Sequence, residues 1–260
     1  MNTTSLEISN VSKYFGGLLA ISEIDLTIRP GELVSIIGPN GSGKSTLFNV
    51  VTGIHRSSSG AIRFNGKDIT HMKPYQVTRQ GIGRTFQQTA IFRRASVLDN
   101  VIIGQLLHTR TAVWGAIFNT RSTRRKEAQT REKARQILSF VNLEDKDSQI
   151  AGNLTQEAQK RLSIAIALAT EPTLLLLDEP TGGVNIREID GLIELVEKVR
   201  KSGISICLIE HKMRMVMNIS DRVIALCYGK KIAEGTPKEV ASHEQVVKAY
   251  LGECNAAPGK

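Results

Sequence analysis

The residue types and spacing best suited to chemistry lie in one glycine-rich run. This run is Gly38-Pro39-Asn40-Gly41-Ser42-Gly43-Lys44-Ser45, which fits the pattern G-x-x-x-x-G-K-[ST]. Such glycines let successive backbone N–H groups point inward around a polyphosphate, and a helix after the loop adds the positive end of its dipole. Lys44 then reaches the β- and γ-phosphates, and the Ser45 hydroxyl binds Mg²⁺. The predicted phosphate-binding residues are Gly38, Pro39, Asn40, Gly41, Ser42, Gly43, Lys44, Ser45 and Thr46.

A second chemical signature is a pair of carboxylates at the end of an apolar run. Leu174–Leu177 is followed directly by Asp178 and Glu179. Asp178 can hold Mg²⁺ through water, and Glu179 can polarise the water that attacks a phosphate. Because acids commonly follow apolar strands, this pair is weak by itself. Together with the glycine-rich loop it predicts a site that binds and hydrolyses a nucleoside triphosphate.

Apolar patterning predicts the elements that must position these residues. Leu33–Ile37 has the pattern of a buried strand leading into the loop, and the apolar residues from Leu47 to Ile54 have that of a helix leaving it. Strand-like runs that alternate with a helical pattern are typical of a parallel sheet. Three such runs lie later in the chain, at Leu174–Leu177, Ile204–Ile209 and Val223–Cys227.

The N-terminal part has shorter, alternating runs. Leu6–Val11 and Ile24–Ile28 have the pattern of half-buried strands, and Asn65-Gly66 has that of a hairpin turn. From about residue 100 to 169 the apolar period is helical. We therefore predict an α/β fold: a P-loop NTPase core with a mostly parallel sheet, an antiparallel N-terminal β flank and a helical subdomain. The prediction treats 1–260 as a single domain, with 1–89 and 166–260 as its catalytic core and 90–165 as the helical subdomain.

The composition excludes several classes of protein. The 260 residues are 41% hydrophobic and 23% charged, which allows a sizeable core to be buried. No stretch without Asp, Glu, Lys or Arg is longer than 11 residues, whereas a membrane-spanning helix needs about 20 apolar residues. The N-terminus has no basic segment followed by an apolar run. We expect neither a membrane span nor a secretory signal.

The net charge of +9 is concentrated in one stretch. Between His108 and Arg135 there are eight Lys and Arg residues against two Glu residues, which supplies +6 of the total. A basic protein can bind nucleic acid, but this charge is local, and a mixture of Lys, Arg, Glu and Gln suits a solvated helix face. Contact with anionic lipid headgroups is a second interpretation. We expect no nucleic-acid partner.

Four further motifs narrow the class of phosphate-loop protein. Gly83-Arg84-Thr85-Phe86-Gln87-Gln88 lies between the core and the helical region, and Leu154-Thr155-Gln156-Glu157-Ala158-Gln159 precedes a helix. Asn185 follows the carboxylate pair, and Ile209-Glu210-His211 puts a histidine just after an apolar strand. Their order resembles the ATP-binding subunit of ABC transporters, and most closely the branched-chain amino-acid uptake branch. This likeness spans about residues 5–252 and is also carried by Phe15-Gly16-Gly17-Leu18 and Ala249-Tyr250-Leu251-Gly252.

The resemblance implies the ABC ATPase fold, ATP and Mg²⁺ as cofactors, and a role for each motif residue. Phe15 stacks on the adenine ring, unless it is an ordinary core aromatic. Gln87 touches Mg²⁺ and the attacking water and senses the membrane partner, although a glutamine here can also be a plain loop residue. His211 hydrogen-bonds the γ-phosphate and holds Glu179 and the water in line, whereas a lone histidine after a strand is usually structural.

The resemblance also implies an assembly on the cytoplasmic face of the cell membrane. The chain is then a peripheral, ATP-hydrolysing subunit that powers an importer for branched-chain or other amino acids. Two ATPase subunits, in a homodimer or a heterodimer, sandwich two ATP molecules, and their closure drives membrane-spanning transporter subunits between two access states. A solute-binding protein takes part indirectly.

The segment 154–158 departs from the family pattern Leu-Ser-x-Gly-Gln, which forms a helix N-terminus that reaches the γ-phosphate of the ATP on the partner. Thr155 keeps a hydroxyl, but Glu157 replaces glycine and Ala158 replaces glutamine. Two unit charges about 5 Å apart at an effective dielectric of ~20 repel by roughly 3 kcal/mol. If Glu157 faces the phosphate, closure weakens about a hundredfold; its side chain can instead turn away. The departure favours a heterodimer, or an ATP-binding regulatory subunit with little turnover of its own.

Overall fold

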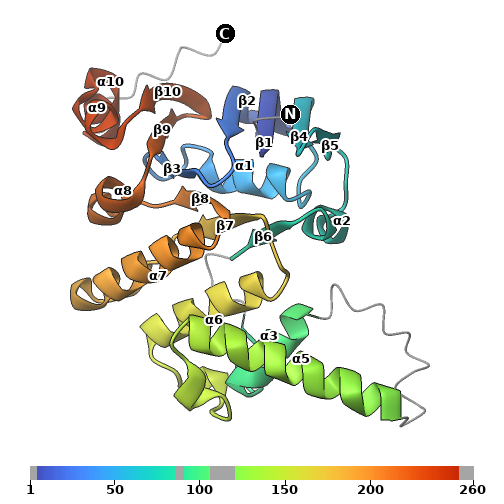
Figure 1. Cartoon of the computed structure of the whole chain (residues 1–260). Helices are drawn as coiled ribbons and strands as arrows, with labels where there is room; N and C mark the ends of the chain where they lie inside the picture. Colours follow the sequence, from blue (N-terminus) through green and yellow to red (C-terminus); the bar gives the residue numbers. More distant parts are fainter. Residues whose placement is uncertain (1–4, 86–90, 106–120, 252–260) are drawn as a thin grey trace.

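The computed structural model describes residues 5–85, 91–105 and 121–251. Figure 1 shows two sheets in the upper part of the molecule and a lobe of helices beneath them. The larger sheet has six strands in the order β10-β9-β3-β8-β7-β6. These strands are β3 (Leu33–Ile37), β6 (Ile82–Arg84), β7 (Leu174–Asp178), β8 (Ser205–Ile209), β9 (Arg222–Cys227) and β10 (Lys230–Gly235).

The six-stranded sheet is parallel except for β10, which pairs antiparallel with β9. Every residue of β3, β7 and β8 is buried, as expected of parallel strands that are covered on both faces. Side chains alternate between the two faces: Leu175 and Leu177 join one core cluster, whereas Leu174 and Leu176 join another. The predicted α/β fold with a mostly parallel sheet is confirmed.

The second sheet is antiparallel and has the order β2-β1-β4-β5, which confirms the predicted N-terminal flank. Its strands are β1 (Leu6–Phe15), β2 (Leu18–Ile28), β4 (Ser59–Phe64) and β5 (Lys67–Asp68). β1 and β2 extend beyond the predicted runs. Register shifts interrupt their pairing, and Asn10 and Glu23 have positive φ of 51° and 49°. Irregular pairing of this kind breaks the period-two alternation from which a strand is predicted.

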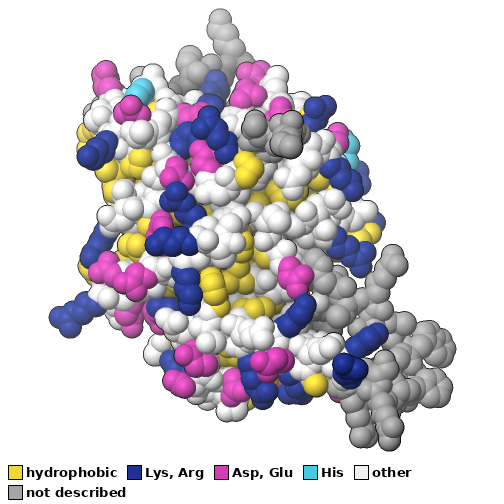
Figure 2. All heavy atoms as spheres, viewed as in Figure 1, with side chains coloured by type: hydrophobic (Ala, Val, Ile, Leu, Met, Phe, Trp, Pro, Cys, Tyr) yellow, Lys and Arg dark blue, Asp and Glu magenta, His cyan; other side chains and the backbone are white. Residues whose placement is uncertain are grey.

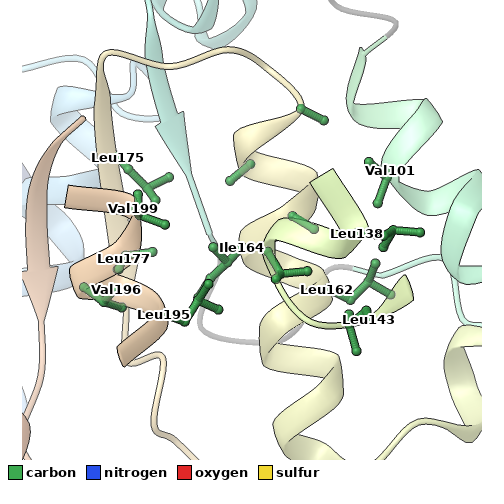
Figure 3. Close-up of a cluster of buried hydrophobic side chains, with 14 of the residues drawn as sticks. Val101, Leu138, Leu143, Leu162, Ile164, Leu175, Leu177, Leu195, Val196 and Val199 are labelled. Atoms are coloured by element: carbon green, nitrogen blue, oxygen red, sulfur yellow. The ribbon is translucent and has the colours of Figure 1, made fainter. Parts of the chain in front are cut away.

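Helix α1 (Lys44–Val51) packs between the two sheets, with Leu47, Phe48 and Val50 in their shared core cluster. On the other face of the large sheet lie α7 (Ile189–Lys201) and the helical lobe, which is built from α3 (Val97–Gln105), α5 (Arg121–Phe140) and α6 (Gln156–Leu168). In Figure 3, Ile164 of α6 faces Leu195 of α7, and Leu162 lies toward Leu138 of α5. Helix α6 therefore joins the lobe to the sheet and continues without a break across the predicted boundary at residue 165.

The shorter described helices are α2 (Pro74–Arg79), α8 (Met213–Ile219), α9 (Pro237–Ser242) and α10 (Glu244–Tyr250), with single 3₁₀ turns at Glu144–Lys146, Ala151–Asn153 and Ile186–Glu188. Helices α9 and α10 lie beside β9 and β10 at the edge of the large sheet (Figure 1). Among the described helices, none has the length and apolar character needed to span a bilayer.

Candidate active site

The glycine-rich loop connects the buried end of β3 to the start of α1, which is the strand–loop–helix context that phosphate binding requires. Two of its glycines are required by close approach of other backbone. A Cβ at Gly38 (φ +148°) would lie 2.1 Å from the carbonyl oxygen of Leu226, and one at Gly43 (φ +100°) would lie 2.7 Å from that of Ala20. The loop therefore packs closely against the backbone of β9 and β2.

The Lys44 side chain is buried inside the loop. Its ammonium donates hydrogen bonds to the carbonyl oxygens of Gly38 (2.8 Å) and Pro39 (2.9 Å) and to the Ser42 hydroxyl (3.1 Å). Burial lowers the pKa of Lys44, and the carboxylates of Glu179 and Asp178 act in the opposite direction. A positive charge is thus enclosed by the loop and faces the carboxylates at the end of β7.

Asp178 is buried at the end of β7 and is paired with Arg84 of β6. Its Oδ2 accepts a hydrogen bond from Arg84 Nη2 at 2.9 Å, while Arg84 Nη1 donates to Asn49 Oδ1 (2.8 Å) and Thr52 Oγ1 (3.1 Å) of the α1 region. Burial raises the pKa of Asp178, and the guanidinium of Arg84 opposes this rise. The other oxygen, Oδ1, is also buried and accepts no hydrogen bond from the described residues.

Glu179 adopts a left-handed backbone conformation with φ +47°. Its N–H donates to the Ile209 carbonyl oxygen (2.9 Å), and its own carbonyl oxygen accepts from Gly182 N–H (3.0 Å) and Lys160 Nζ (3.1 Å). The His211 side chain is half exposed, and its Nδ1 lies 3.9 Å from Glu179 Oε1. The two residues predicted to act on water are therefore neighbours, because β7 and β8 end side by side.

The phosphate loop, Glu179 and Phe15 line one cleft of about 420 Å³. Phe15 is 41% exposed, and its ring meets that of His55 edge-on with 5.1 Å between centroids. Lys13 Nζ lies 4.9 Å from the centroid of the Phe15 ring. The alternative that Phe15 is a core aromatic does not fit this exposure, and its contact with adenine stays a prediction.

The predicted site residues fall into four groups. Residues 40–46, Glu179 and Phe15 share the cleft, and Gly38, Pro39, Asp178 and His211 adjoin it. Thr155 does not line this cleft: it is the N-cap of α6, where its Oγ1 accepts a hydrogen bond from Ala158 N–H at 3.3 Å. Gln87 lies outside the described residues.

Glu157 turns away from the N-terminus of α6. Its carboxylate pairs with Arg161 one turn further along the helix, and both side chains are mostly buried. Arg161 also donates to the Val141 carbonyl oxygen at 3.2 Å, and a Cβ at Gly191 of α7 would come within 2.7 Å of Arg161 Nη2. The sequence leaves two orientations open for Glu157, toward the phosphate or turned away. The structure has the second, and Arg161 balances the charge of the carboxylate.

Four residues of this region were not predicted from the sequence: Arg84, Lys160, Glu210 and Tyr250. The Tyr250 hydroxyl oxygen, at the end of α10, accepts a hydrogen bond from the N–H of Gly38 at 3.0 Å. Arg84, Glu210 and Tyr250 lie inside the motifs described above, whereas Lys160 lies outside them. The sequence does not indicate which groups these four side chains contact, so only the fold reveals their partners.

The glycine-rich phosphate loop lies at the carboxyl edge of a parallel sheet and faces two carboxylates at the end of β7, which is separated from β3 by β8. This arrangement defines a nucleoside-triphosphate-binding protein. Comparison with known proteins narrows this class. The ABC transporter family model matches residues 21–182, and the chain belongs to this family of ATP-binding proteins. A second model, described as branched-chain amino acid ATP-binding cassette transporter, matches residues 230–253.

Individual relatives match over nearly the whole chain. The branched-chain amino acid transport ATP-binding protein BraF of Pseudomonas aeruginosa is 38% identical, covering 97% of this chain and 100% of BraF. LivG of Escherichia coli, a protein of the same description, is 36% identical with the same coverage. The crystal structure of a nucleotide-free ATP-binding cassette from an ABC transporter superimposes with a TM-score of 0.85 at 34% identity, covering 96% of this chain and 100% of the cassette.

Proposed function

We propose that this chain hydrolyses ATP at the cytoplasmic face of the cell membrane to power the import of branched-chain amino acids. The observation that carries the proposal is the single cleft in which Lys44, Glu179 and Phe15 come together. A cation for the phosphates, a carboxylate for the attacking water and an exposed aromatic ring for the base are the groups that ATP hydrolysis needs. The full-length similarity to BraF and LivG supports the choice of solute.

In the proposed reaction, the loop N–H groups and Lys44 hold the β- and γ-phosphates. Glu179 polarises a water molecule and accepts its proton. The water oxygen attacks the γ-phosphorus while the bond from this phosphorus to the β-phosphate oxygen breaks, and ADP and inorganic phosphate leave. His211 holds the γ-phosphate and keeps Glu179 and the water in line, which its position 3.9 Å from Glu179 Oε1 supports. Gln87, which lies outside the described residues, is assigned to the water and the metal by resemblance alone.

The residues present suit Mg²⁺, which takes oxygen ligands and is usually bound by one or two carboxylates together with substrate phosphates. The Ser45 hydroxyl and the Asp178 carboxylate supply such oxygens, and Asp178 Oδ1 is a buried acceptor with no hydrogen bond from the described residues. We propose that Ser45, Asp178 and Gln87 hold the ion. When bound, Mg²⁺ neutralises charge that develops on the phosphate oxygens.

We further propose that two ATPase subunits close on two ATP molecules, with Thr155 at the N-terminus of α6 directed to the ATP of the other subunit. The ion pair between Glu157 and Arg161 removes much of the expected repulsion, because the carboxylate is balanced before ATP arrives. With less repulsion, association of two copies of this chain around ATP becomes more favourable. The replaced glycine and glutamine still favour a heterodimer, and a regulatory subunit that binds ATP with little turnover is the alternative.

The proposed partners are membrane-spanning transporter subunits, with a solute-binding protein acting through them. A nucleic-acid partner is not part of the proposal. On the face drawn in Figure 2, Lys and Arg side chains are interspersed with Asp and Glu and form no uniform basic surface. An ABC-type ATPase that acts on nucleic acid would bind DNA or RNA in a salt-sensitive manner, so binding at low salt would contradict this choice.

The deciding experiment measures ATP hydrolysis by the purified chain over a wide range of protein concentration, with Glu179→Gln as the blank. Turnover that rises more than linearly with concentration supports a hydrolytic homodimer and contradicts the heterodimer. ATP binding without turnover points to a missing second ATPase. If a co-purified second ATPase also fails to restore turnover, the regulatory alternative replaces the hydrolytic proposal.

A further inference from the structure

A fully buried carboxylate, Glu210, lies at the centre of the carboxyl edge of the large sheet. It follows directly on β8, the strand between β3, which leads into the phosphate loop, and β7, which ends in Asp178. Its exposed fraction is 0%. Because a buried carboxylate is costly unless it is well hydrogen-bonded, a side chain placed here needs several donors.

Glu210 finds four donors, and they come from two segments. Its Oε1 accepts from the N–H (3.0 Å) and the hydroxyl of Thr181, which belongs to the turn after Glu179. Its Oε2 accepts from the backbone N–H groups of His211 (2.9 Å) and Lys212 (3.0 Å). Each oxygen therefore serves one segment, and a single carboxylate links the turn that carries Glu179 to the segment that carries His211.

Two lysines complete the link. Lys212 Nζ donates to the carbonyl oxygens of Thr181 (2.9 Å) and Val184 (3.1 Å), so the same two segments are tied a second time. Lys160 Nζ reaches from α6 to the carbonyl oxygen of Glu179 at 3.1 Å. The turn after Glu179 is thus held on one side by the histidine segment and on the other by the helix that begins at Thr155.

This turn needs such support because of its backbone conformation. Glu179 has φ +47°, and a non-glycine residue persists in that strained region only where the surrounding structure fixes it. Misplacement of a reacting group by about 1 Å can lower a rate roughly 100-fold. The separation of 3.9 Å between Glu179 Oε1 and His211 Nδ1 therefore depends on how the two segments are joined.

We propose that Glu210 is a positioning residue for ATP hydrolysis: through Thr181 on one oxygen and the His211 and Lys212 amides on the other, it holds Glu179 and His211 in register. This inference rests on the hydrolytic function proposed above. Glu210 itself touches neither nucleotide nor water in this role.

The kinetic test compares Glu210→Gln and Thr181→Val with two controls. Thr181→Ser restores the hydroxyl lost in Thr181→Val, and Glu194→Gln makes the same chemical change on the exposed face of α7. We expect kcat to fall about 10- to 100-fold in Glu210→Gln and about 5- to 10-fold in Thr181→Val, with KM and ATP affinity within about twofold. Thr181→Ser and Glu194→Gln should match the wild type. A loss that lies entirely in KM, or an unchanged kcat, would overturn the proposal.

Hydrogen exchange separates failure of this inference from failure of the proposed function. It is measured with Mg²⁺ and ATP on proteins that also carry Glu179→Gln, so no turnover is required. We expect Thr181→Val to speed exchange at the amides of His211 and Lys212 as well as at residue 181, because both segments depend on Glu210. Faster exchange at residue 181 alone would overturn the link. Wild-type turnover no greater than that of Glu179→Gln would instead count against the hydrolytic function.

Discussion

The phosphate loop and the segment 154–161 at the start of α6 are both predicted to touch ATP, yet they are built in opposite ways. The loop satisfies every fixed position of its motif, and neighbouring backbone determines its glycines, as at Gly38 beside the Leu226 carbonyl. Segment 154–161 has lost the expected glycine and glutamine but keeps a capped helix N-terminus at Thr155. Its replacement carboxylate, Glu157, is balanced by Arg161.

The difference shows where the fold restricts the residue type. At Gly38 and Gly43 of the loop, a Cβ would meet the backbone of a neighbouring strand, so larger residues are disfavoured at these two positions whatever the ligand. At the start of α6, Thr155 and Gln156 are exposed, and the new charge of Glu157 is balanced by a local partner, Arg161, one helical turn away. A departure from a family motif therefore has a smaller effect at 154–161 than the same departure would have in the loop.

The largest expected effect on ATP hydrolysis comes from Glu179, the residue proposed to polarise the attacking water. We predict that Glu179→Gln lowers ATP hydrolysis by about 10²–10⁴-fold, because the group that polarises the attacking water is lost. ATP affinity should stay within about twofold, since the loop and Lys44 are unchanged. Steady-state hydrolysis and fluorescence-based nucleotide binding measure the two quantities. Residual turnover near the wild-type level would move the role of base to another residue.

Alanine substitutions at two loop glycines test whether nearby backbone restricts the residue type in the loop. Gly38 and Gly41 both have positive φ (+148° and +79°), but a Cβ at Gly41 meets nothing within 4 Å. We predict that Gly38→Ala weakens ATP binding about a hundredfold, equivalent to ~2.7 kcal/mol, because the loop must shift away from Leu226. Gly41→Ala should cost about 1 kcal/mol in unfolding free energy with little loss of affinity. Similar affinities in the two variants would contradict the proposed restriction.

At 154–161 we predict a smaller effect that depends on charge balance. Arg161→Met leaves the Glu157 carboxylate without its partner, so ATP-driven association should weaken about tenfold, equivalent to ~1.4 kcal/mol. The double variant Glu157→Gln with Arg161→Met should restore most of this loss. Association is measured by sedimentation in a Glu179→Gln background with Mg²⁺ and ATP, beside whichever ATPase subunit the concentration series identifies. Equal association of Arg161→Met and the double variant would show that the charge does not face ATP.

The same contrast explains which parts of the fold and of the site can be predicted from the sequence. Uninterrupted apolar runs such as Leu174–Leu177 predict buried strands because both faces of a parallel sheet are covered, and the loop pattern locates the phosphate site. The ends of β1 and β2 are missed because irregular pairing near Asn10 and Glu23 breaks their alternation. Glu210 is missed for a different reason: its four donors come from segments about thirty residues apart, which only the pairing of β7 with β8 brings together.

The smallest expected effect tests whether α10, near the C-terminus, also helps to hold the phosphate loop in place. Tyr250 joins α10 to the phosphate loop through one neutral hydrogen bond, from Gly38 N–H at 3.0 Å. Because Tyr250 is 44% exposed, water can replace its hydroxyl, and the loss lies at the lower end of the usual range, about 0.5 kcal/mol. We therefore predict that Tyr250→Phe lowers ATP affinity roughly twofold, measured by nucleotide titration beside the wild type. A loss above about tenfold would mean that water cannot substitute, and that α10 sets the shape of the loop together with β2 and β9.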